Sequence, residues 1–385
     1  MKITAILLIA ISAVICLDFV NEYDLIGDEP YHAKQVDRFV NGNYNVFEGL
    51  SVPPTYHHII AFIARCLNVN TLAGYRIINT VLLLVTLIPL FYLLTRSLTK
   101  TFQLYFFPLM FMFYFLVYTD LFSLMVILVT FYFAKKKWYW LSAVFGTLSV
   151  FVRQNNIFWI GFICCYIYVN EYDYKISWNI FKEYYRKIWS YGIGVVLFGI
   201  FIWMKGSIVM GDAERHPIAI HFGNVWFILF LFFFLFFPYI ITSVPRMIDY
   251  VKKRKSIIVL LVGVFLIGLG TFHNDHIYNN KPGIWFNNFL QMLQASPFLL
   301  IGYFIIITVV ILYLCTVNLN DKGGYLLYLF TILYLLFSWL IEPRYYFIPF
   351  ALFILFKSSS ESWVEKFVLG YYIIVGVLFF MMMLP

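Results

Sequence analysis

Long apolar stretches separated by short polar breaks run through the whole chain. Several of them approach about 20 residues, the length that a helix needs to cross about 30 Å of hydrocarbon. The first covers residues 3–17, and we interpret it as a retained span because no small-residue cleavage site follows it. Further spans are expected at residues 77–95, 101–117, 121–134, 139–152, 156–170, 188–205, 223–243, 256–272, 297–316, 324–341, 345–357 and 366–384.

This pattern predicts an all-α polytopic membrane protein with roughly 12–14 transmembrane helices in a single domain, residues 1–385. Two of the stretches, 121–134 and 345–357, are short for a full crossing and could be re-entrant or tilted pieces. Residues 18–76 form a long first loop, within which residues 31–40 could be a short helix on the membrane surface. The composition agrees, since only 12% of the residues are charged, about half the fraction of a soluble domain.

The polar breaks fall into two classes. One class is rich in lysine and arginine, as at residues 135–137, 175–187 and 246–255, and the positive-inside rule places it in the cytosol. The other class contains all seven histidines, which that rule does not use. The non-cytosolic face of the protein is therefore expected to carry the side chains that could take part in catalysis. The net charge of +8 then reflects topology, and we expect no nucleic-acid partner.

An acidic cluster directly follows the first span, where Gly27-Asp28-Glu29-Pro30 precedes His32. Adjacent carboxylates at a membrane surface could take a proton from a substrate hydroxyl. Asp28 could instead cap the helix that Pro30 begins, and the two roles are compatible. A third interpretation is a metal site made of Asp28, Glu29, His32 and the His57-His58 pair, but no typical ligand spacing supports it.

Four further polar breaks lie on the same predicted face. Arg153-Gln154-Asn155-Asn156 interrupts an apolar stretch, and its arginine could either snorkel to lipid headgroups or bind a phosphate. Glu342 and Arg344 could be a structural ion pair or part of a site. The other two breaks are Tyr118-Thr119-Asp120 and the run from Gly211-Asp212 to His216 and His221.

Taken in order, these motifs resemble the α-1,2-glucosyltransferases of the endoplasmic reticulum, which add the terminal glucose to the lipid-linked oligosaccharide precursor of N-glycosylation. The resemblance spans residues 26–346. It departs from the family pattern at Asn155, where threonine is usual, and at Pro343, where an aromatic or aliphatic residue is usual.

The resemblance implies a GT-C-type glycosyltransferase with a long first luminal loop in the endoplasmic reticulum membrane and an active site on the luminal side. It implies a dolichyl-phosphate-glucose donor and a diglucosylated dolichol-linked oligosaccharide acceptor. The donor is β-linked and the product α-linked, so the reaction inverts the anomeric carbon in one displacement and needs one base. We expect no metal and no cofactor, because a lipid-phosphate leaving group carries less charge than a nucleotide diphosphate.

On this basis Asp28 is the expected base, with Glu29 its close competitor. His32 would orient the base or contact a phosphate oxygen, and Arg153 and Arg344 would stabilise the departing phosphate. The residues expected to bind donor phosphate or substrate are His32, Asp120, Arg153, Gln154, Asp212, His221, Glu342, Arg344 and Tyr345. Two competing interpretations are a transferase for another polyprenyl-phosphate sugar, such as mannose, and a lipid or solute transporter.

Overall fold

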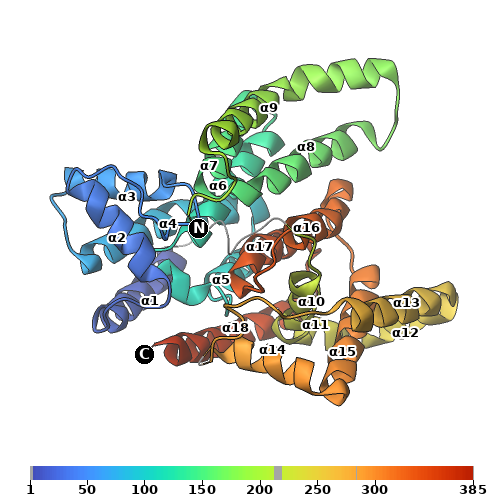
Figure 1. The fold of residues 1–385 in the computed structure, drawn as a ribbon. Helices are drawn as coiled ribbons and strands as arrows, with labels where there is room; N and C mark the ends of the chain where they lie inside the picture. Colours follow the sequence, from blue (N-terminus) through green and yellow to red (C-terminus); the bar gives the residue numbers. More distant parts are fainter. Residues whose placement is uncertain (1–2, 212–218, 283, 385) are drawn as a thin grey trace.

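The computed structural model describes residues 3–211, 219–282 and 284–384, and it consists of helices joined by short connections (Figure 1). The helices are α1 (Ile3–Asn21), α2 (Glu29–Val40), α3 (Thr55–Cys66), α4 (Leu72–Thr95), α5 (Leu98–Tyr105), η1 (Phe111–Tyr114), α6 (Thr119–Lys135), α7 (Tyr139–Val152), η2 (Gln154–Asn156), α8 (Ile157–Tyr172), α9 (Trp178–Lys205), α10 (Gly223–Leu235), α11 (Phe237–Thr242), α12 (Val244–Lys253), α13 (Ser256–Thr271), α14 (Trp285–Ala295), α15 (Pro297–Thr316), η4 (Lys322–Tyr325), α16 (Leu326–Leu336), η5 (Pro343–Tyr346), α17 (Phe347–Phe356) and α18 (Ser362–Met383).

The expected all-α polytopic class is confirmed, but the number of long spans is lower than expected. Among the described residues, five helices are long and apolar enough to cross a membrane: α1, α4, α9, α15 and α18. The pair α12 and α13, which is bent by 110°, could provide a sixth. Several other predicted spans, such as 139–152 and 223–243, are shorter apolar helices. Apolar runs of 10–14 residues are common in helices that pack within protein.

Helix α17 is an apolar helix that is too short to cross a membrane, and it packs inside the protein. All ten of its residues are buried, so neighbouring helices rather than lipid surround it. Helix α6, which contacts α17, is also buried along most of its length. These are the two short stretches that the sequence marked as re-entrant or tilted pieces. Asp120 lies in the first turn of α6, and Arg344 lies in η5, directly before α17.

The expected span at 101–117 is wrong. Helix α5 ends at Tyr105, and the chain then runs through buried, mostly irregular backbone to Tyr118. Pro108 accounts for the break, because proline lacks an amide donor and disfavours helix at the residue before it. Two side chains of α4 satisfy the carbonyl groups left free: Asn79 donates to the Leu116 carbonyl at 2.7 Å and Thr80 to the Tyr114 carbonyl at 2.8 Å. Irregular backbone at this depth is tolerated only where protein groups take its hydrogen bonds.

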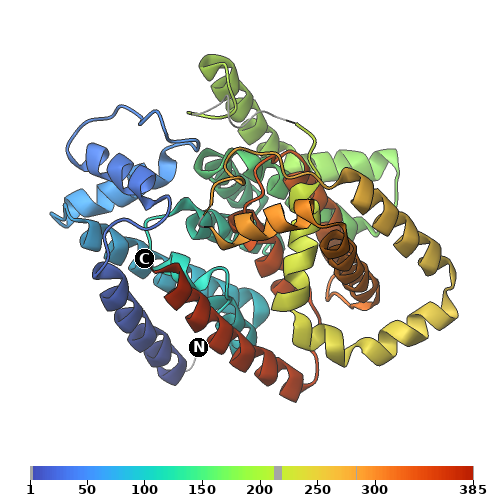
Figure 2. The ribbon, with the colours of Figure 1, turned by 60° about the horizontal axis from the view of Figure 1, so that its bottom comes forward.

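Segments distant in sequence complete the packing. The C-terminal helix α18 packs against α5, and α16 packs against α8 (Figure 2). Lys135 at the end of α6 pairs with Asp321 at 3.2 Å, and Lys322 pairs with Asp173 at the end of α8 at 2.6 Å. The basic run 135–137 and Asp173, which comes just before the basic run 175–187, thus both contact residues 321–322.

The first loop forms a compact unit in which α2 packs against α3. The predicted helix in this loop is confirmed as α2, with Pro30 in its first turn. Glu29 anchors it to the membrane helices, because its carboxylate accepts hydrogen bonds from Arg76 of α4 at 2.6 and 3.0 Å. It also accepts from the backbone amides of Ile26 and Val117. Both side chains of this ion pair are fully buried.

Replacing Arg76 by leucine should destabilise the protein by about 3–5 kcal/mol, because it leaves the Glu29 charge buried without its partner. The unfolding midpoint in detergent, followed by tryptophan fluorescence, measures this effect. The double variant Arg76→Leu/Glu29→Leu should be more stable than Arg76→Leu alone, since no charge remains buried. Equal loss in the single and double variants would contradict the ion-pair explanation.

Candidate active site

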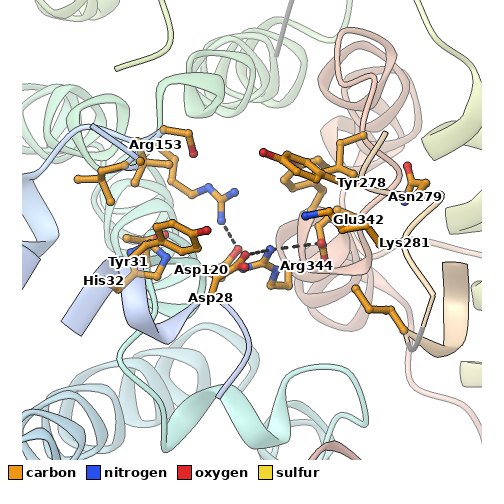
Figure 3. A pocket seen from close by; sticks show the side chains of 18 of the residues that line it. Asp28, Tyr31, His32, Asp120, Arg153, Tyr278, Asn279, Lys281, Glu342 and Arg344 are labelled. Atoms are coloured by element: carbon orange, nitrogen blue, oxygen red, sulfur yellow. Dashed lines mark hydrogen bonds and ion pairs between the residues drawn. The ribbon is translucent and has the colours of Figure 1, made fainter. Parts of the chain in front are cut away.

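The polar breaks of the sequence gather around one cavity of about 530 Å³. It is bounded by the first loop, the start of α6, the α7–α8 junction, residues 278–287 and the segment before α17. We call it the polar cavity (Figure 3). Seven of the expected site residues line it: Asp28, His32, Asp120, Arg153, Glu342, Arg344 and Tyr345. Residues from five distant parts of the sequence therefore share one chamber.

Asp28 faces this cavity. It occupies the N-cap position of α2, but its side chain makes no capping hydrogen bond, so the interpretation of Asp28 as a helix cap alone is wrong. Its Oδ2 instead accepts a hydrogen bond from Nη2 of Arg344 at 2.5 Å. Arg344 is the main reason that the pKa of the Asp28 carboxyl is lowered, and Lys281 lowers it further. Asp28 is therefore ionised at neutral pH.

Gly27 and Tyr118 fix the turn that presents Asp28. The Tyr118 hydroxyl accepts a hydrogen bond from the Asp28 amide and donates one to the Ile26 carbonyl at 3.0 Å. Gly27 has a φ of +61°, and a Cβ atom there would lie 2.6 Å from the same hydroxyl. Both the left-handed conformation and the close approach of Tyr118 require glycine at this position.

The two adjacent carboxylates of the cluster have different environments. The Asp28 side chain is 48% exposed, whereas the Glu29 side chain is 0% exposed and bonded to Arg76. Glu29 is not among the residues that line the polar cavity. Asp28 therefore faces the chamber, whereas Glu29 is directed at Arg76 of α4.

Arg344 connects the first loop to the far end of the chain. Its Nη2 atom contacts both Asp28 and Glu342, and its Nε atom lies 3.1 Å from Glu342. The guanidinium also stacks over the Tyr118 ring, 5.4 Å from its centroid. Glu342 and Arg344 do form an ion pair, as one interpretation of the sequence expected, but the pair is open to the cavity and includes Asp28.

A second ion pair lies across the cavity, between Arg153 and Asp120. The Arg153 side chain is 13% exposed and its guanidinium lies over the Tyr345 ring, 5.6 Å from the centroid. It therefore points into the protein, and the interpretation that it snorkels to lipid headgroups is wrong. Its Nε atom is buried without a hydrogen-bond partner.

A second cavity, of about 390 Å³, adjoins the first. We call it the apolar cavity, because α8, α9 and residues 337–340 line it mainly with aromatic and aliphatic side chains. Gln154 lines this cavity rather than the polar one, and donates to the Ser51 carbonyl at 3.0 Å. The two cavities share Ser51, Val52, Arg153, Leu340 and Tyr345. Arg153 thus stands at the junction between a charged chamber and an apolar one.

The comparisons with known proteins agree with this arrangement. The family model of the DIE2/ALG10 family matches residues 23–179 and 168–355, which include every element that lines the two cavities. The chain belongs to the DIE2/ALG10 family.

Relatives named "Dol-P-Glc:Glc(2)Man(9)GlcNAc(2)-PP-Dol alpha-1,2-glucosyltransferase" are similar over most of their length. The protein of Candida albicans is 24% identical, over 88% of this chain and 85% of the relative. The Arabidopsis thaliana protein is 23% identical, over 87% of each, and the Drosophila melanogaster protein 22% identical, over 92% and 88%. No solved structure matches the chain.

Among the remaining expected residues, His221 does not line the polar cavity. Asp212 lies outside the described residues, as does His216. The His221 ring stacks on Trp339, with centroids 5.4 Å apart. Trp339 lines the apolar cavity but His221 lines neither cavity, so its expected contact with a phosphate in this site has no geometric support.

The residues that the sequence suggested as metal ligands instead contact other side chains. Glu29 pairs with Arg76, and His58 stacks on Phe39 at a centroid distance of 3.8 Å. His57 is buried and hydrogen-bonded to His32. Within the described ranges, no three His, Cys, Asp or Glu side chains are grouped as a metal site would need.

Sequence reasoning missed two asparagines that position the site. Asn224 of α10 donates to the Ser338 and Leu340 carbonyls, at 2.8 and 2.7 Å, and accepts from the Glu342 amide. Asn279 pairs with both the amide and the carbonyl of Ile341. Together they hold the segment that carries Glu342 and Arg344. An asparagine at the edge of an apolar stretch was the available signal, because a buried amide needs partners.

Replacing Gly27 by alanine should destabilise the protein, because a left-handed conformation costs a non-glycine residue about 1–2 kcal/mol and the new methyl group meets the Tyr118 hydroxyl. The thermal unfolding midpoint measures the loss. Tyr118→Phe removes the opposing oxygen, so the double variant should be less destabilised than the sum of the single variants. Strict additivity would contradict the proposed contact.

Proposed function

We propose that this protein transfers glucose from dolichyl-phosphate-glucose to a dolichol-linked oligosaccharide that carries two glucose residues, forming an α-1,2 bond. The observation that carries the proposal is the junction of the two cavities. A lipid-phosphate sugar needs an apolar chamber for its chain, cationic groups for its phosphate and a polar chamber for its sugar. The apolar cavity, Arg153 and the polar cavity follow one another in that order. The names and broad coverage of the relatives support the same reaction.

Asp28 acts as the base in this proposal. Its ionised carboxylate takes the proton of the acceptor hydroxyl as that oxygen bonds to the anomeric carbon. The bond between the anomeric carbon and the phosphate oxygen breaks in the same displacement, and dolichyl phosphate leaves with the electron pair. Inversion in one step requires no second carboxylate. The burial of Glu29 and its bonds to Arg76 favour Asp28 over Glu29.

Arg153 and Arg344 stabilise the departing phosphate. Arg153 contributes from the junction, where its buried Nε has no partner, and Arg344 from beside the base. Charge develops on the phosphate as the bond breaks, so a fixed guanidinium acts most strongly in the transition state. The two carboxylates Asp120 and Glu342 hold these arginines in place. Negative charge is thus handled by protein cations, and the proposal includes no metal.

We further propose that the polar cavity opens to the lumen of the endoplasmic reticulum. The residues that line it come from the predicted loops that are poor in lysine and rich in histidine. The basic ends near Lys135 and Lys322 come from other connections, which the positive-inside rule places in the cytosol.

Incubation of the purified protein with polyprenyl-phosphate donors and the diglucosylated acceptor tests the function. We expect transfer from the glucosyl donor, and Asp28→Asn should reduce it by at least about 100-fold while donor binding persists. Asp28→Glu is the matched control that keeps a carboxylate. Transfer of mannose and not glucose would reject the proposed donor, and full activity of Asp28→Asn would reject Asp28 as the base.

The pH dependence tests the role of Arg344. Arg344 lowers the pKa of Asp28, and the base must be deprotonated, so activity falls as the pH drops through that pKa. Arg344→Gln should therefore move the acid limb of kcat/KM to higher pH, because burial then raises the pKa of Asp28 without opposition from Arg344. The pH of the acid limb is compared between the wild-type protein and the variant, because the maximal rate also falls. If the acid limb stays at the same pH, Arg344 does not set the pKa of the base.

A further inference from the structure

A pair of buried histidines lies at the wall of the polar cavity. His32 of α2 lines the cavity, and its Nδ1 atom lies 2.9 Å from Nε2 of His57 on α3. The ring planes are 17° apart, and the centroids are separated by 5.2 Å. With the two nitrogens in hydrogen-bond contact, this spacing fits two nearly coplanar rings that meet edge to edge. One proton therefore lies between the two nitrogens.

Both rings are neutral at physiological pH. Burial is the largest influence on each ring: it lowers the pKa of His32 to about 4 and that of His57 well below its usual range. The charged groups around His32 oppose one another: Asp120 and Asp28 raise its pKa, whereas Arg344 and Arg153 lower it. A neutral imidazole has one N–H and one acceptor nitrogen, so the proton between the rings decides what His32 offers to the cavity.

The surroundings of His57 select one arrangement of protons. Its Nδ1 atom is buried and makes no hydrogen bond of normal geometry. The backbone carbonyl of Pro54 nevertheless favours a proton on this ring, and since Nε2 already contacts His32, the carbonyl acts on Nδ1. An unprotonated Nδ1 would set a lone pair against that carbonyl in a buried site. His57 therefore carries its proton on Nδ1, and its Nε2 accepts from Nδ1 of His32.

His32 consequently presents Nε2 to the cavity as an acceptor. Among the described residues this nitrogen has no hydrogen-bond partner, since the contact with His57 involves Nδ1. A nitrogen with only a lone pair repels phosphate oxygens and attracts hydroxyl hydrogens. This tautomer suits a sugar hydroxyl better than the phosphate oxygen that the sequence suggested as one contact of His32.

We infer that His32 accepts a hydrogen bond from a sugar hydroxyl and so determines substrate specificity, and that His57 is the positioning residue that fixes its tautomer. The inference rests on the proposed function for the identity of the sugar. A site built to accept a hydroxyl discriminates strongly against a substrate that lacks it, because the acceptor is then left unpaired. His32 thus recognises a sugar hydroxyl, while Arg153 and Arg344 bind the phosphate.

The pair is poorly suited to carry the proton away from Asp28. A proton passed through His32 to His57 would arrive at a buried Nδ1 that has no hydrogen-bond partner among the described residues. There is no onward path to water from that atom within the described contacts. A fixed hydrogen-bond acceptor is the role that this geometry serves.

Donors and acceptors that each lack one sugar hydroxyl test the inference. The wild-type protein should use one of these deoxy analogues about tenfold more slowly than the parent substrate, the loss expected for one hydrogen bond. His32→Phe and His57→Leu should be slower with the parent and should use that analogue and the parent at similar rates. His57→Gln, whose amide oxygen can accept from His32, should retain the preference of the wild-type protein.

His58→Leu is the matched control, because His58 is the adjacent residue on α3 and stacks on Phe39 outside the cavity. It should keep both the rate and the preference. If His57→Leu lowers all rates equally and keeps the preference, His57 has only a structural role and the inference is wrong. An unchanged preference in His32→Phe would also overturn it. If the wild-type protein transfers mannose and not glucose, the proposed donor fails, and the same variants test the pair with deoxy-mannosyl donors.

Discussion

The buried ion pair between Glu29 and Arg76 is the constraint on which the site depends. It joins the first loop to α4, and Glu29 also binds the amide of Val117 in the irregular segment before α6. A charge in this interior is stable only with a partner, so the pair fixes where α2 begins. Asp28, one residue earlier, is thereby turned toward the polar cavity. Glu29, which does not line the polar cavity, thus sets the position of Asp28, the proposed base.

Charge balance organises the rest of the cavity. Two arginines and three carboxylates meet there as connected pairs, Arg153 with Asp120 and Arg344 with Asp28 and Glu342. Each arginine is oriented by a carboxylate and keeps a face toward the chamber. In the proposed reaction such preorganisation matters because the groups need not rearrange as the phosphate departs. The histidine pair, as we infer its role, adds a hydrogen-bond acceptor for a sugar hydroxyl without adding charge.

Much of this was predictable because the bilayer makes polar residues conspicuous. Asp28, Arg153 and Arg344 are polar residues at the ends of apolar stretches, and the structure gathers them in one cavity. Arg76, Asn79 and Asn224 were missed because each lies within or beside a helix whose pattern otherwise predicts only a span. Their partners are backbone groups and side chains far away in sequence, and periodicity carries no information about such pairs. The span at 101–117 was mispredicted for the same reason, since Asn79, Thr80 and Glu29 bond to its irregular backbone from other parts of the chain.

The sequence by itself determined the all-α membrane class, the separation of basic ends from histidine-rich ones and the set of candidate residues, because these follow from local composition and from the thickness of a bilayer. Only the tertiary structure gave Asp28 and Glu29 different environments, set Arg153 at the junction of two cavities and gave His32 a histidine partner. These outcomes depend on which buried groups neutralise one another, and that pairing exists only once distant helices are packed together.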